Sequence, residues 1–334
     1  MSTVTSDAVL ALQIIEIRRL NPLVCLLRIG NRSESPESLP GFTAGAHISI
    51  KVRLPDGTQD WRRYSLINLS REKESSVRPT EYLVGVRLET EGRGGSRYLH
   101  WQVTEGDWLE VQAPRNDFPL QVCAGRTILI GGGIGITPVA SMAAACRATA
   151  RPVTLYYAGR SRSSMALLEE LQQLLGDDLV VHIDDEQSAP LDIAAILDSC
   201  SSKDHLYICG PQPLLDAVLV QTAGRSWDAG RVHFELFGAP SLSADDRSFE
   251  LILQSSGKRL TVPPSKSVLT VLNEAGCDVM FDCERGECGV CAVEVLSGVI
   301  DHRDYVLTER EKHEGRVMHA CVSRCKGAVL VLNL

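Results

Sequence analysis

This 334-residue chain lacks several features that would assign it to a common class of protein. No stretch approaches the ~18 uninterrupted apolar residues that a membrane-spanning helix needs. The first seven residues are polar and do not have the basic-then-apolar order of a signal peptide. The net charge of −8 argues against nucleic acid or an anionic membrane as a partner. We therefore expect a cytoplasmic protein with neither of these partners.

Catalytic patterns of hydrolases are also missing, because the sequence has no convincing Ser–His–Asp or metal-protease arrangement. The composition, 44% hydrophobic and 23% charged, is that of a packed globular protein, and the length suggests two or three domains. Eleven cysteines in so long a chain are not a disulfide framework. Seven of them stand singly, and small buried hydrophobic side chains are the simplest interpretation: Cys25, Cys123, Cys146, Cys200, Cys209, Cys277 and Cys325.

The remaining four cysteines form a C-x₄-C-x₂-C run with a fourth member after 29 intervening residues: Cys283, Cys288, Cys291 and Cys321. This spacing is typical of plant-type [2Fe–2S] centres, in which four thiolates hold two irons. Gly286 and Gly289 would let the loop bend and direct N–H groups at the sulfurs. A four-cysteine zinc site is the alternative, but zinc ligands usually come in two closely spaced pairs.

The flanking segments predict a compact β-grasp fold around this cysteine set. Four strands and one helix are expected from the alternation of apolar residues and the turn residues between them: strands 249–254, 258–262, 292–296 and 328–332, and a helix over 267–275 ended by Gly276. Residues 237–246, rich in turn-forming and small polar residues, predict a linker before this fold.

A glycine-rich turn indicates a nucleotide site earlier in the chain. The apolar residues 127–130 lead into Gly131-Gly-Gly-Ile-Gly-Ile-Thr-Pro138, and a helix is expected over 139–147. Thr137 would be its N-cap and Pro138 its first residue. Such a turn presents backbone N–H groups and a helix dipole to a pyrophosphate, although a tight turn without a ligand is the alternative. The candidate residues are Gly131, Gly132, Gly133, Gly135 and Thr137.

This is not the usual Rossmann fingerprint, because its third glycine is missing and the next strand, 153–157, ends in Ala158-Gly-Arg160 without an acid for a ribose hydroxyl. Arg160 and Arg162 could contact ribose or a 2′-phosphate, with a solvated loop charge as the alternative for Arg162. A second buried strand, 205–209, ends in Cys209-Gly210-Pro211 before a helix over 213–222. Strands that alternate with helices predict a parallel sheet, and ligands bind at the carboxyl ends of its strands.

The N-terminal third is β-rich, with strands expected over 10–17, 24–29, 47–52 and 82–86 and a Pro-Asp-Gly57 hairpin. These strands predict a small barrel. Two polar clusters stand out in it, Trp61-Arg-Arg-Tyr-Ser-Leu66 and Gly92-Arg-Gly-Gly-Ser96, the second before a helical stretch over 97–102. From the residues alone, surface loops are the simpler interpretation of both.

The order of these motifs resembles the phthalate dioxygenase reductase family of the ferredoxin–NADP reductase superfamily. Arg62-Arg63-Tyr64-Ser65 matches its R-x-Y-S flavin motif, and the glycine turn, Cys209-Gly-Pro211, Phe234-Glu-Leu-Phe237 and a ferredoxin module follow in the family's order over residues 10–334. The resemblance implies an FMN-binding β-barrel (1–120), an NAD-binding α/β domain (121–236), a linker (237–247) and a [2Fe–2S] β-grasp domain (248–334). The charged stretch 70–80 departs from the family because it is long for a hairpin.

The resemblance also assigns roles to individual residues. Around FMN it places Arg62, Gly94, Gly95 and Ser96 at the phosphate, Tyr64 and Ser65 at the ribityl chain and isoalloxazine, and Val86 and Arg87 beside the flavin. Around NADH it places Gly131, Gly132, Gly133, Gly135, Thr137, Arg160, Cys209, Gly210 and Pro211, with Thr137 and Cys209 near the nicotinamide. Phe237 would cover the flavin, with a core aromatic as the alternative. Ser65, Thr137, Cys209 and Phe237 are thus the residues expected nearest to the reaction.

The implied function is hydride transfer from NADH to FMN, followed by single-electron transfer through the cluster to a terminal oxygenase. A flavin suits this task because it accepts two electrons and releases them singly. A Rieske-type oxygenase that acts on an aromatic or other small compound is the favoured partner. The alternatives are a di-iron monooxygenase, a cytochrome, or a protein that uses the cluster as a redox sensor.

The charge of the C-terminal part bears on how such a partner docks. Residues 247–334 hold 12 acidic and 11 basic side chains, whereas docking by long-range attraction favours a large charge of one sign. We therefore predict short-range contacts around the cluster loop, residues 284–290. A local acidic patch of Asp282, Glu284 and Glu287 is the alternative.

Overall fold

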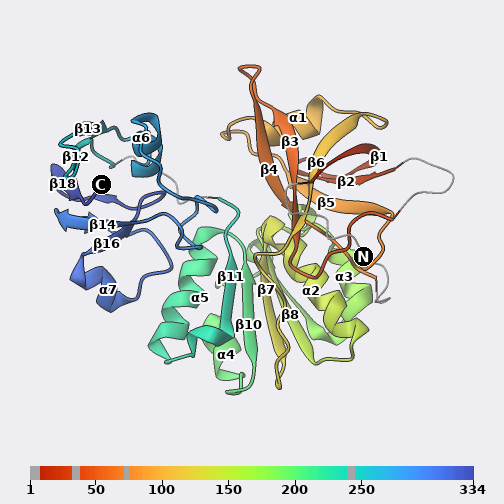
Figure 1. The fold of residues 1–334 in the computed structure, drawn as a ribbon. Helices are drawn as coiled ribbons and strands as arrows, with labels where there is room; N and C mark the ends of the chain where they lie inside the picture. Colours follow the sequence, from red (N-terminus) through yellow and green to blue (C-terminus); the bar gives the residue numbers. More distant parts are fainter. Residues whose placement is uncertain (1–7, 32–37, 71–75, 239–244) are drawn as a thin grey trace. The chain divides into compact units, whose positions relative to one another are not determined.

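A computed structural model describes residues 8–31, 38–70, 76–238 and 245–334. The chain divides into two compact units, Met1–Glu235 and Leu236–Leu334 (Figure 1). In the part of the chain that the structure describes, no helix is both long and apolar enough to cross a membrane.

The first half of unit Met1–Glu235 is an antiparallel sheet of six strands in the order β4-β3-β6-β1-β2-β5. Its strands are β1 Val9–Asn21, β2 Val24–Gly30, β3 His47–Arg53, β4 Gln59–Ser65, β5 Glu81–Arg87 and β6 Trp108–Arg115. An antiparallel bridge between Leu66, just after β4, and Val84 of β5 joins the two edges of the sheet, as a barrel requires. One short helix, α1 Gly95–Trp101, follows β5.

The barrel strands that the sequence predicted are present, and β4 and β6 are two further strands. The polar cluster at residues 61–66 lies largely in β4, so its interpretation as a surface loop is wrong. Pattern analysis does not predict β4, because most of its residues are half-buried and lack the buried–exposed alternation that marks a strand.

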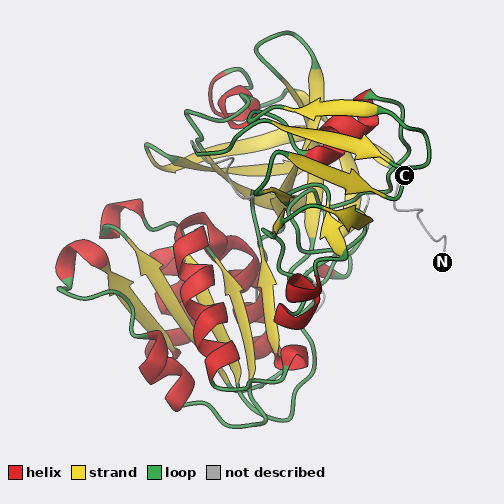
Figure 2. Ribbon diagram, turned by 90° about the vertical axis from the view of Figure 1, so that its left-hand side faces the viewer, coloured by secondary structure: helices red, strands yellow, loops and turns green. Residues whose placement is uncertain are grey.

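The second half of this unit is a parallel sheet of five strands in the order β11-β10-β7-β8-β9. Figure 2 shows helices on both faces of this sheet. The strands are β7 Thr127–Gly132, β8 Val153–Gly159, β9 Leu179–Ile183, β10 His205–Cys209 and β11 Val232–Glu235. The helices are α2 Ile136–Ala148, α3 Leu168–Leu175, α4 Ile193–Asp198 and α5 Gln212–Gly224, with 3₁₀ turns η2 Gly133–Gly135, η3 Arg162–Ser164, η4 Gly176–Asp178, η5 Asp184–Glu186 and η6 Ala229–Arg231.

This parallel sheet confirms the α/β prediction, with one correction at the start of α2. The helix begins at Ile136 and its N-cap is Gly135, so Thr137 is not the N-cap and Pro138 is not the first helical residue. The Thr137 hydroxyl donates instead to the Ile134 carbonyl (3.0 Å). The glycines before it already form a 3₁₀ turn, which lets the helix begin earlier than the N-cap preferences of threonine suggest.

Unit Leu236–Leu334 is built on a mixed five-stranded sheet in the order β13-β12-β18-β14-β16, with a two-stranded β15–β17 ladder. Its elements are β12 Phe249–Leu253, β13 Arg259–Val262, α6 Val268–Glu274, β14 Ala292–Ser297, β15 Ile300–Asp301, α7 Glu309–Glu314, β16 Val317–His319, β17 Arg324–Cys325 and β18 Val329–Leu332. The Ser267 hydroxyl caps α6 by accepting from the Thr270 N–H, as its position predicts. Strands β12 and β18 pair in parallel, and each has an antiparallel neighbour on its other side, β13 and β14 respectively. This is the β-grasp arrangement that the sequence predicted.

Three of the seven single cysteines, Cys25, Cys146 and Cys209, are buried, as expected. The interpretation as buried hydrophobic residues is wrong for the other four, which are half-buried: Cys123, Cys200, Cys277 and Cys325. The predicted linker over 237–247 includes residues 239–244, which lie outside the described residues, as do residues 71–75 of the charged stretch 70–80.

Candidate functional site

A cation and a glycine-rich helix start meet in the barrel. Arg62 stands on β4 opposite Ile50 of β3. A Cβ added at Gly95 would lie 3.0 and 3.1 Å from Cγ and Nε of Arg62, so the arginine side chain packs directly on the start of α1. One guanidinium nitrogen, Nη1, pairs with Asp60 and donates to the Trp61 carbonyl (2.9 Å), while Nη2 is buried and has no hydrogen-bond partner among the described residues.

The start of α1 supplies backbone donors beside this guanidinium. Gly94, the N-cap, has φ 102°, a left-handed conformation that favours glycine. The first N–H groups of any helix have no partner within the helix, and here they belong to residues 95 and 96. The Ser96 hydroxyl accepts from the Glu89 N–H (2.9 Å) and so fixes the preceding loop. A buried donor without a partner next to free helix N–H groups fits a phosphate, as expected for FMN.

The remaining flavin candidates lie on two neighbouring strands. Ser65 is buried, and Tyr64 is half-buried, with desolvation raising the pKa of its phenol above the usual range. Val86 is buried and its carbonyl accepts from His100 Nε2 (3.0 Å), whereas Arg87 is exposed and pairs with Glu89 (2.6 Å). The structure therefore places Ser65, Tyr64 and Val86 in the barrel wall and Arg87 at its surface.

The flavin strands touch the nucleotide turn at two points that the sequence did not indicate. A Cβ at Gly85, next to Val86 on β5, would lie 2.9 Å from Cγ2 of Thr137. The Ser141 hydroxyl of α2 donates to the Leu66 carbonyl (2.7 Å) and accepts from the Asn68 N–H (2.9 Å). Helix α2 is therefore held against two parts of the barrel. One is the segment just after Ser65 of β4, and the other is Gly85, the residue just before Val86 on β5. Gly85 and Ser141 carry no local motif, so only their contacts reveal this role.

The two glycine turns of the parallel sheet lie against each other. Gly131 of β7 is in register with Cys209 of β10, and a Cβ at Gly135 would lie 2.2 Å from the Cys209 carbonyl oxygen. A Cβ at Gly132 would lie 2.7 Å from Cδ of Pro211. Side chains at these glycines would therefore push the turns apart. Both turns stand at the carboxyl ends of their strands, where an α/β sheet binds its ligand.

The arginines after β8 differ in their contacts. Arg160 is exposed, and its carbonyl accepts from the Asp185 N–H (2.9 Å). Arg162 pairs with Glu186 (2.8 Å) at the surface. Arg160 remains a candidate for ribose or phosphate, whereas the Glu186 pair favours the solvated-charge interpretation of Arg162.

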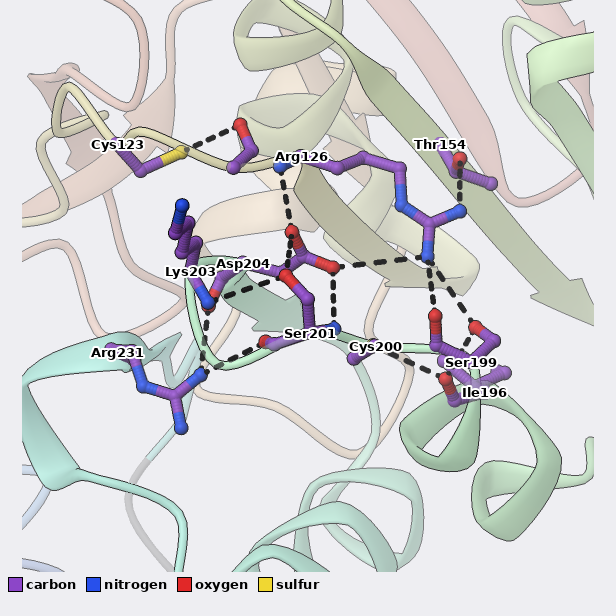
Figure 3. A network of polar contacts seen from close by, with 11 residues as sticks. Cys123, Arg126, Thr154, Ile196, Ser199, Cys200, Ser201, Lys203, Asp204 and Arg231 are labelled. Carbon is purple, nitrogen blue, oxygen red and sulfur yellow. Dashed lines mark hydrogen bonds and ion pairs between the residues drawn. The ribbon is translucent and has the colours of Figure 1, made fainter.

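A separate polar network lies at the opposite, amino ends of the parallel strands (Figure 3). The Asp204 carboxylate, just before β10, accepts from the backbone N–H groups of Arg126 (2.8 Å) and Ser201 (2.9 Å). Burial raises the pKa of Asp204, but these hydrogen bonds outweigh burial and hold it below its ordinary value. The Arg126 guanidinium also donates to the Ser199 carbonyl (3.2 Å). Because ligands bind at the other ends of such strands, we assign this network a structural role.

The four cysteines of the spaced set come together in the second unit, in two pairs. Cys283 interacts with Cys288, and Cys291 is hydrogen-bonded to Cys321, which lowers the pKa of Cys291 to about 6. Among the described residues, no three His, Cys, Asp or Glu side chains lie in a group that could hold a single metal ion. Two pairs of thiolates fit two irons, each with two protein ligands, better than one zinc ion.

The cluster loop has the backbone shape that the sequence predicted. Gly286 and Gly289 have φ 79° and 78°, and Glu284 also has a positive φ, 54°. The backbone N–H of Arg285 donates to Cys283 Sγ (3.3 Å), and Gly286 provides a backbone hydrogen bond to Cys321. Such N–H···S contacts stabilise thiolates, so the loop fits an iron–sulfur cluster.

A buried acid behind the loop, Asp304, was not predicted from the sequence. Its carboxylate accepts from the N–H of Leu307 (2.9 Å) and pairs with Nδ1 of His319 (3.3 Å). Burial raises its pKa, but the His319 contact and the backbone N–H groups outweigh burial and bring it to about 2. Gly286 packs against Asp304 and Val322. The Gly286 carbonyl accepts from the backbone N–H of Tyr305, the residue directly after Asp304 (2.9 Å). Asp304 thus supports the cluster loop through contacts that no local pattern announces.

Two charged residues of the cluster loop pair with each other. They are Arg285 and Glu287 (2.6 Å), and their side chains are only 12% and 15% exposed. Glu284 is exposed. The acidic-patch alternative is therefore wrong for Glu287.

Phe237 belongs to the second unit and is 43% exposed. Its expected contact with the flavin stays a prediction.

Comparisons with known proteins agree with this geometry. A model of the oxidoreductase NAD-binding domain matches residues 129–219, and a model of the 2Fe-2S iron-sulfur cluster binding domain matches residues 251–326. The chain is 37% identical over 338 residues to phthalate dioxygenase reductase of Burkholderia cepacia, with 100% of both chains covered. It is 40% identical over 310 residues to a putative toluene-4-sulfonate monooxygenase system reductase subunit of Comamonas testosteroni, which covers 92% of this chain and 94% of the relative.

A solved structure gives the same result for the fold. The structure of phthalate dioxygenase reductase, described as modular for electron transfer from pyridine nucleotides to [2Fe-2S], matches with a TM-score of 0.71 and 36% identity. The match covers 98% of each chain.

Proposed function

This chain belongs to the phthalate dioxygenase reductase family, and we propose that it carries electrons from NADH through FMN and a [2Fe–2S] cluster to a terminal oxygenase. It is an NAD(P)H-dependent flavin iron–sulfur oxidoreductase. FMN supplies the step between a two-electron donor and a one-electron acceptor.

The contact between Gly85 and Thr137 is the observation that carries this proposal. Hydride transfer requires the nicotinamide to lie against the flavin ring, in an orientation that brings the reacting atoms together. The strand expected beside the flavin touches the helix start expected to bind the nucleotide, so one side chain, Thr137, is available to both ligands. Cys209, at the end of β10, packs against the same turn through Gly135.

The proposed roles follow from these positions. Arg62 and the N–H groups at Gly94, Gly95 and Ser96 hold the FMN phosphate. Tyr64, Ser65, Val86 and Arg87 hold the rest of the flavin, and Phe237 covers it. The turn residues hold NADH: Gly131, Gly132, Gly133, Gly135, Thr137, Arg160, Cys209, Gly210 and Pro211. The thiolates of Cys283, Cys288, Cys291 and Cys321 bind the cluster.

An anaerobic NADH titration of the purified protein tests the proposal. We expect flavin absorbance to bleach first and the iron–sulfur bands to follow, and we expect acid extraction to release FMN. A colourless protein that contains zinc, or the release of FAD in place of FMN, would contradict it. A parallel titration with NADPH reports the nucleotide preference.

The partner is an oxygenase component, because the relatives serve dioxygenase or monooxygenase systems. We propose a Rieske-type oxygenase in the cytoplasm. The test is electron delivery from the NADH-reduced protein to a purified Rieske-type oxygenase, followed by the Rieske signal of that oxygenase in electron paramagnetic resonance (EPR) spectra. Reduction of a cytochrome or a di-iron protein in its place would contradict the Rieske assignment.

The domain boundaries remain part of the proposal. The flavin part would end near residue 120, the NAD part would span 121–236 and the ferredoxin part 248–334, with 237–247 as the linker. Limited proteolysis that cuts first within 237–247 and leaves a red iron–sulfur fragment is the expected result.

A further inference from the structure

Two charged residues between the cluster ligands are turned away from solvent. Arg285 and Glu287 lie between Cys283 and Cys288, and Nη2 of Arg285 is 2.6 Å from Oε1 of Glu287. Charges in a surface loop are normally solvated, because burying an ion costs more than a surface pair gains. An ion pair that is mostly shielded from solvent in a surface loop therefore calls for further partners.

Those partners are the two polar groups of one distant peptide residue. The Leu236 N–H donates to Oε2 of Glu287 (3.0 Å), and the Leu236 carbonyl accepts from Nη1 of Arg285. Hydrogen bonds to an ionised group are roughly twice as strong as neutral ones. The Leu236 side chain is itself buried. The pair thus binds both backbone groups of Leu236, its N–H and its carbonyl.

The gripped residue has a special place in the chain. Leu236 directly follows Glu235, the last residue of β11, and directly precedes Phe237. Arg285 is also tied to the cluster ligands, because its backbone N–H donates to Cys283 Sγ (3.3 Å). The loop that supplies three of the four thiolates is therefore bonded to the first residue of its own unit, directly after the end of β11.

We propose that Arg285 and Glu287 are positioning residues for electron transfer from the flavin to the cluster. By holding Leu236 they fix the cluster loop to the residue at which its unit begins. This inference rests on the proposed function, because it supposes a flavin that reduces the cluster. Neither residue contacts NADH in this role, so hydride transfer is independent of them.

The main test is a variant that removes the grip without changing the net charge of the loop, Arg285→Ala with Glu287→Ala. Anaerobic stopped-flow mixing with NADH separates flavin bleaching from cluster bleaching. We expect the flavin to be reduced at the wild-type rate and the cluster about 10-fold more slowly or worse, since displacements of about 1 Å cost up to 100-fold in oriented reactions. Cluster absorbance before mixing, the EPR spectrum of the cluster and its reduction potential should be those of the wild type.

A second variant acts from the other side of the contact. Leu236→Pro removes the N–H that Glu287 accepts and leaves the loop intact, so it decides the matter if the double variant fails to hold a cluster. Glu287→Gln keeps an oxygen for the Leu236 N–H and should restore part of the rate. Glu274→Ala is the matched control, because it breaks an exposed ion pair with Lys266 (2.7 Å) elsewhere in the same unit.

Wild-type rates of cluster reduction in the double variant and in Leu236→Pro would overturn the inference. So would equal slowing in Glu274→Ala. A failure of the proposed function is distinguishable, because the flavin of the wild-type protein would then not be reduced by NADH at all.

Discussion

At the scale of single residues, the clearest functional sign is a buried donor without a partner. Native proteins rarely leave a buried charged nitrogen unsatisfied, because the desolvation penalty is large. Arg62 Nη2 is such a nitrogen, at the start of α1. A bound phosphate would satisfy it.

Arg62→Ala should weaken FMN binding by about ten- to a hundred-fold, because a charge-assisted contact to phosphate is worth ~1.5–3 kcal/mol. Fluorescence titration of the apoprotein with FMN measures the loss. Arg53→Ala, at an exposed position on the neighbouring β3, is the control and should bind FMN as the wild type does. Equal affinities for the two variants would refute the phosphate assignment.

Cysteine identity gives a second prediction at this scale. Cys321→Ser should remove or destabilise the cluster while NADH still reduces the flavin, since Cys321 is paired with Cys291 in the second unit. Cys325→Ser should keep the cluster spectrum, because its Sγ contacts only backbone around Val329 and Gly327 among the contacts described. The visible spectrum decides, and the reverse pattern would show that the ligand assignment is wrong.

The pH dependence of stability should involve His233. Burial lowers the pKa of His233 to about 4, with the neighbouring His205 as a second cause. The unfolded chain binds the proton near pH 6.5, so the folded state loses stability as the pH falls from about 6.5 to 4, by roughly 3 kcal/mol at most.

Thermal release of the flavin, followed by its fluorescence at pH 7 and pH 5, measures this effect. His233→Phe keeps a ring against Tyr207 (4.4 Å between centroids) but cannot titrate, and should show a smaller difference between the two pH values. An unchanged pH dependence in this variant would rule out His233 as the cause.

At the scale of elements, β7, η2 and α2 pack as one piece against β10, and we propose that this piece binds the nucleotide. The glycines are needed here for close approach of backbones, most clearly at Gly135. Ser141 then ties the same helix to the flavin part through Leu66 and Asn68. In the proposed function, the geometry of hydride transfer would therefore depend on this one helix, which is held on both sides.

Gly135→Ala should raise KM for NADH at least about tenfold while FMN stays bound, because the new Cβ would meet the Cys209 carbonyl at 2.2 Å and the turn must shift. Steady-state reduction of ferricyanide by NADH measures it. Gly224→Ala, where a Cβ meets nothing within 4 Å, is the control. An unchanged KM in Gly135→Ala would contradict a nucleotide site at this turn.

At the scale of the whole molecule, the question is how the oxygenase is recognised. The inward pair of Arg285 and Glu287 removes two charges from the surface of the cluster loop. Large apolar side chains near the ligands are exposed instead: Met280, Phe281, Val290 and Val306. These observations support the prediction of short-range docking.

Turnover with the oxygenase should therefore fall less than about tenfold between low salt and about 0.5 M salt. Electrostatic steering contributes about 10- to 1000-fold to association and fades steeply with ionic strength. NADH–flavin reduction at the same salt concentrations is the control. A larger fall in turnover, with flavin reduction unchanged, would show that long-range attraction controls docking.

The sequence by itself determined the elements whose chemistry is local. Thiolate spacing and the glycine turn are readable because their residues act within one loop, and helix and strand periods follow from side-chain geometry. The β-grasp, the parallel sheet and most of the barrel were predicted in this way. The R-x-Y-S motif was readable only through the family resemblance. The strand β4 was missed because most of its residues are half-buried and show no alternation.

Only the tertiary structure decided which distant segments meet. Gly85 touches Thr137, Gly135 touches Cys209, and Asp304 supports Gly286, yet no local pattern announces these pairs. The inward turn of Arg285 and Glu287 depends on Leu236, about fifty residues earlier in the chain. A periodic pattern shows that a face is buried but not what buries it, because packing partners are chosen by the whole fold.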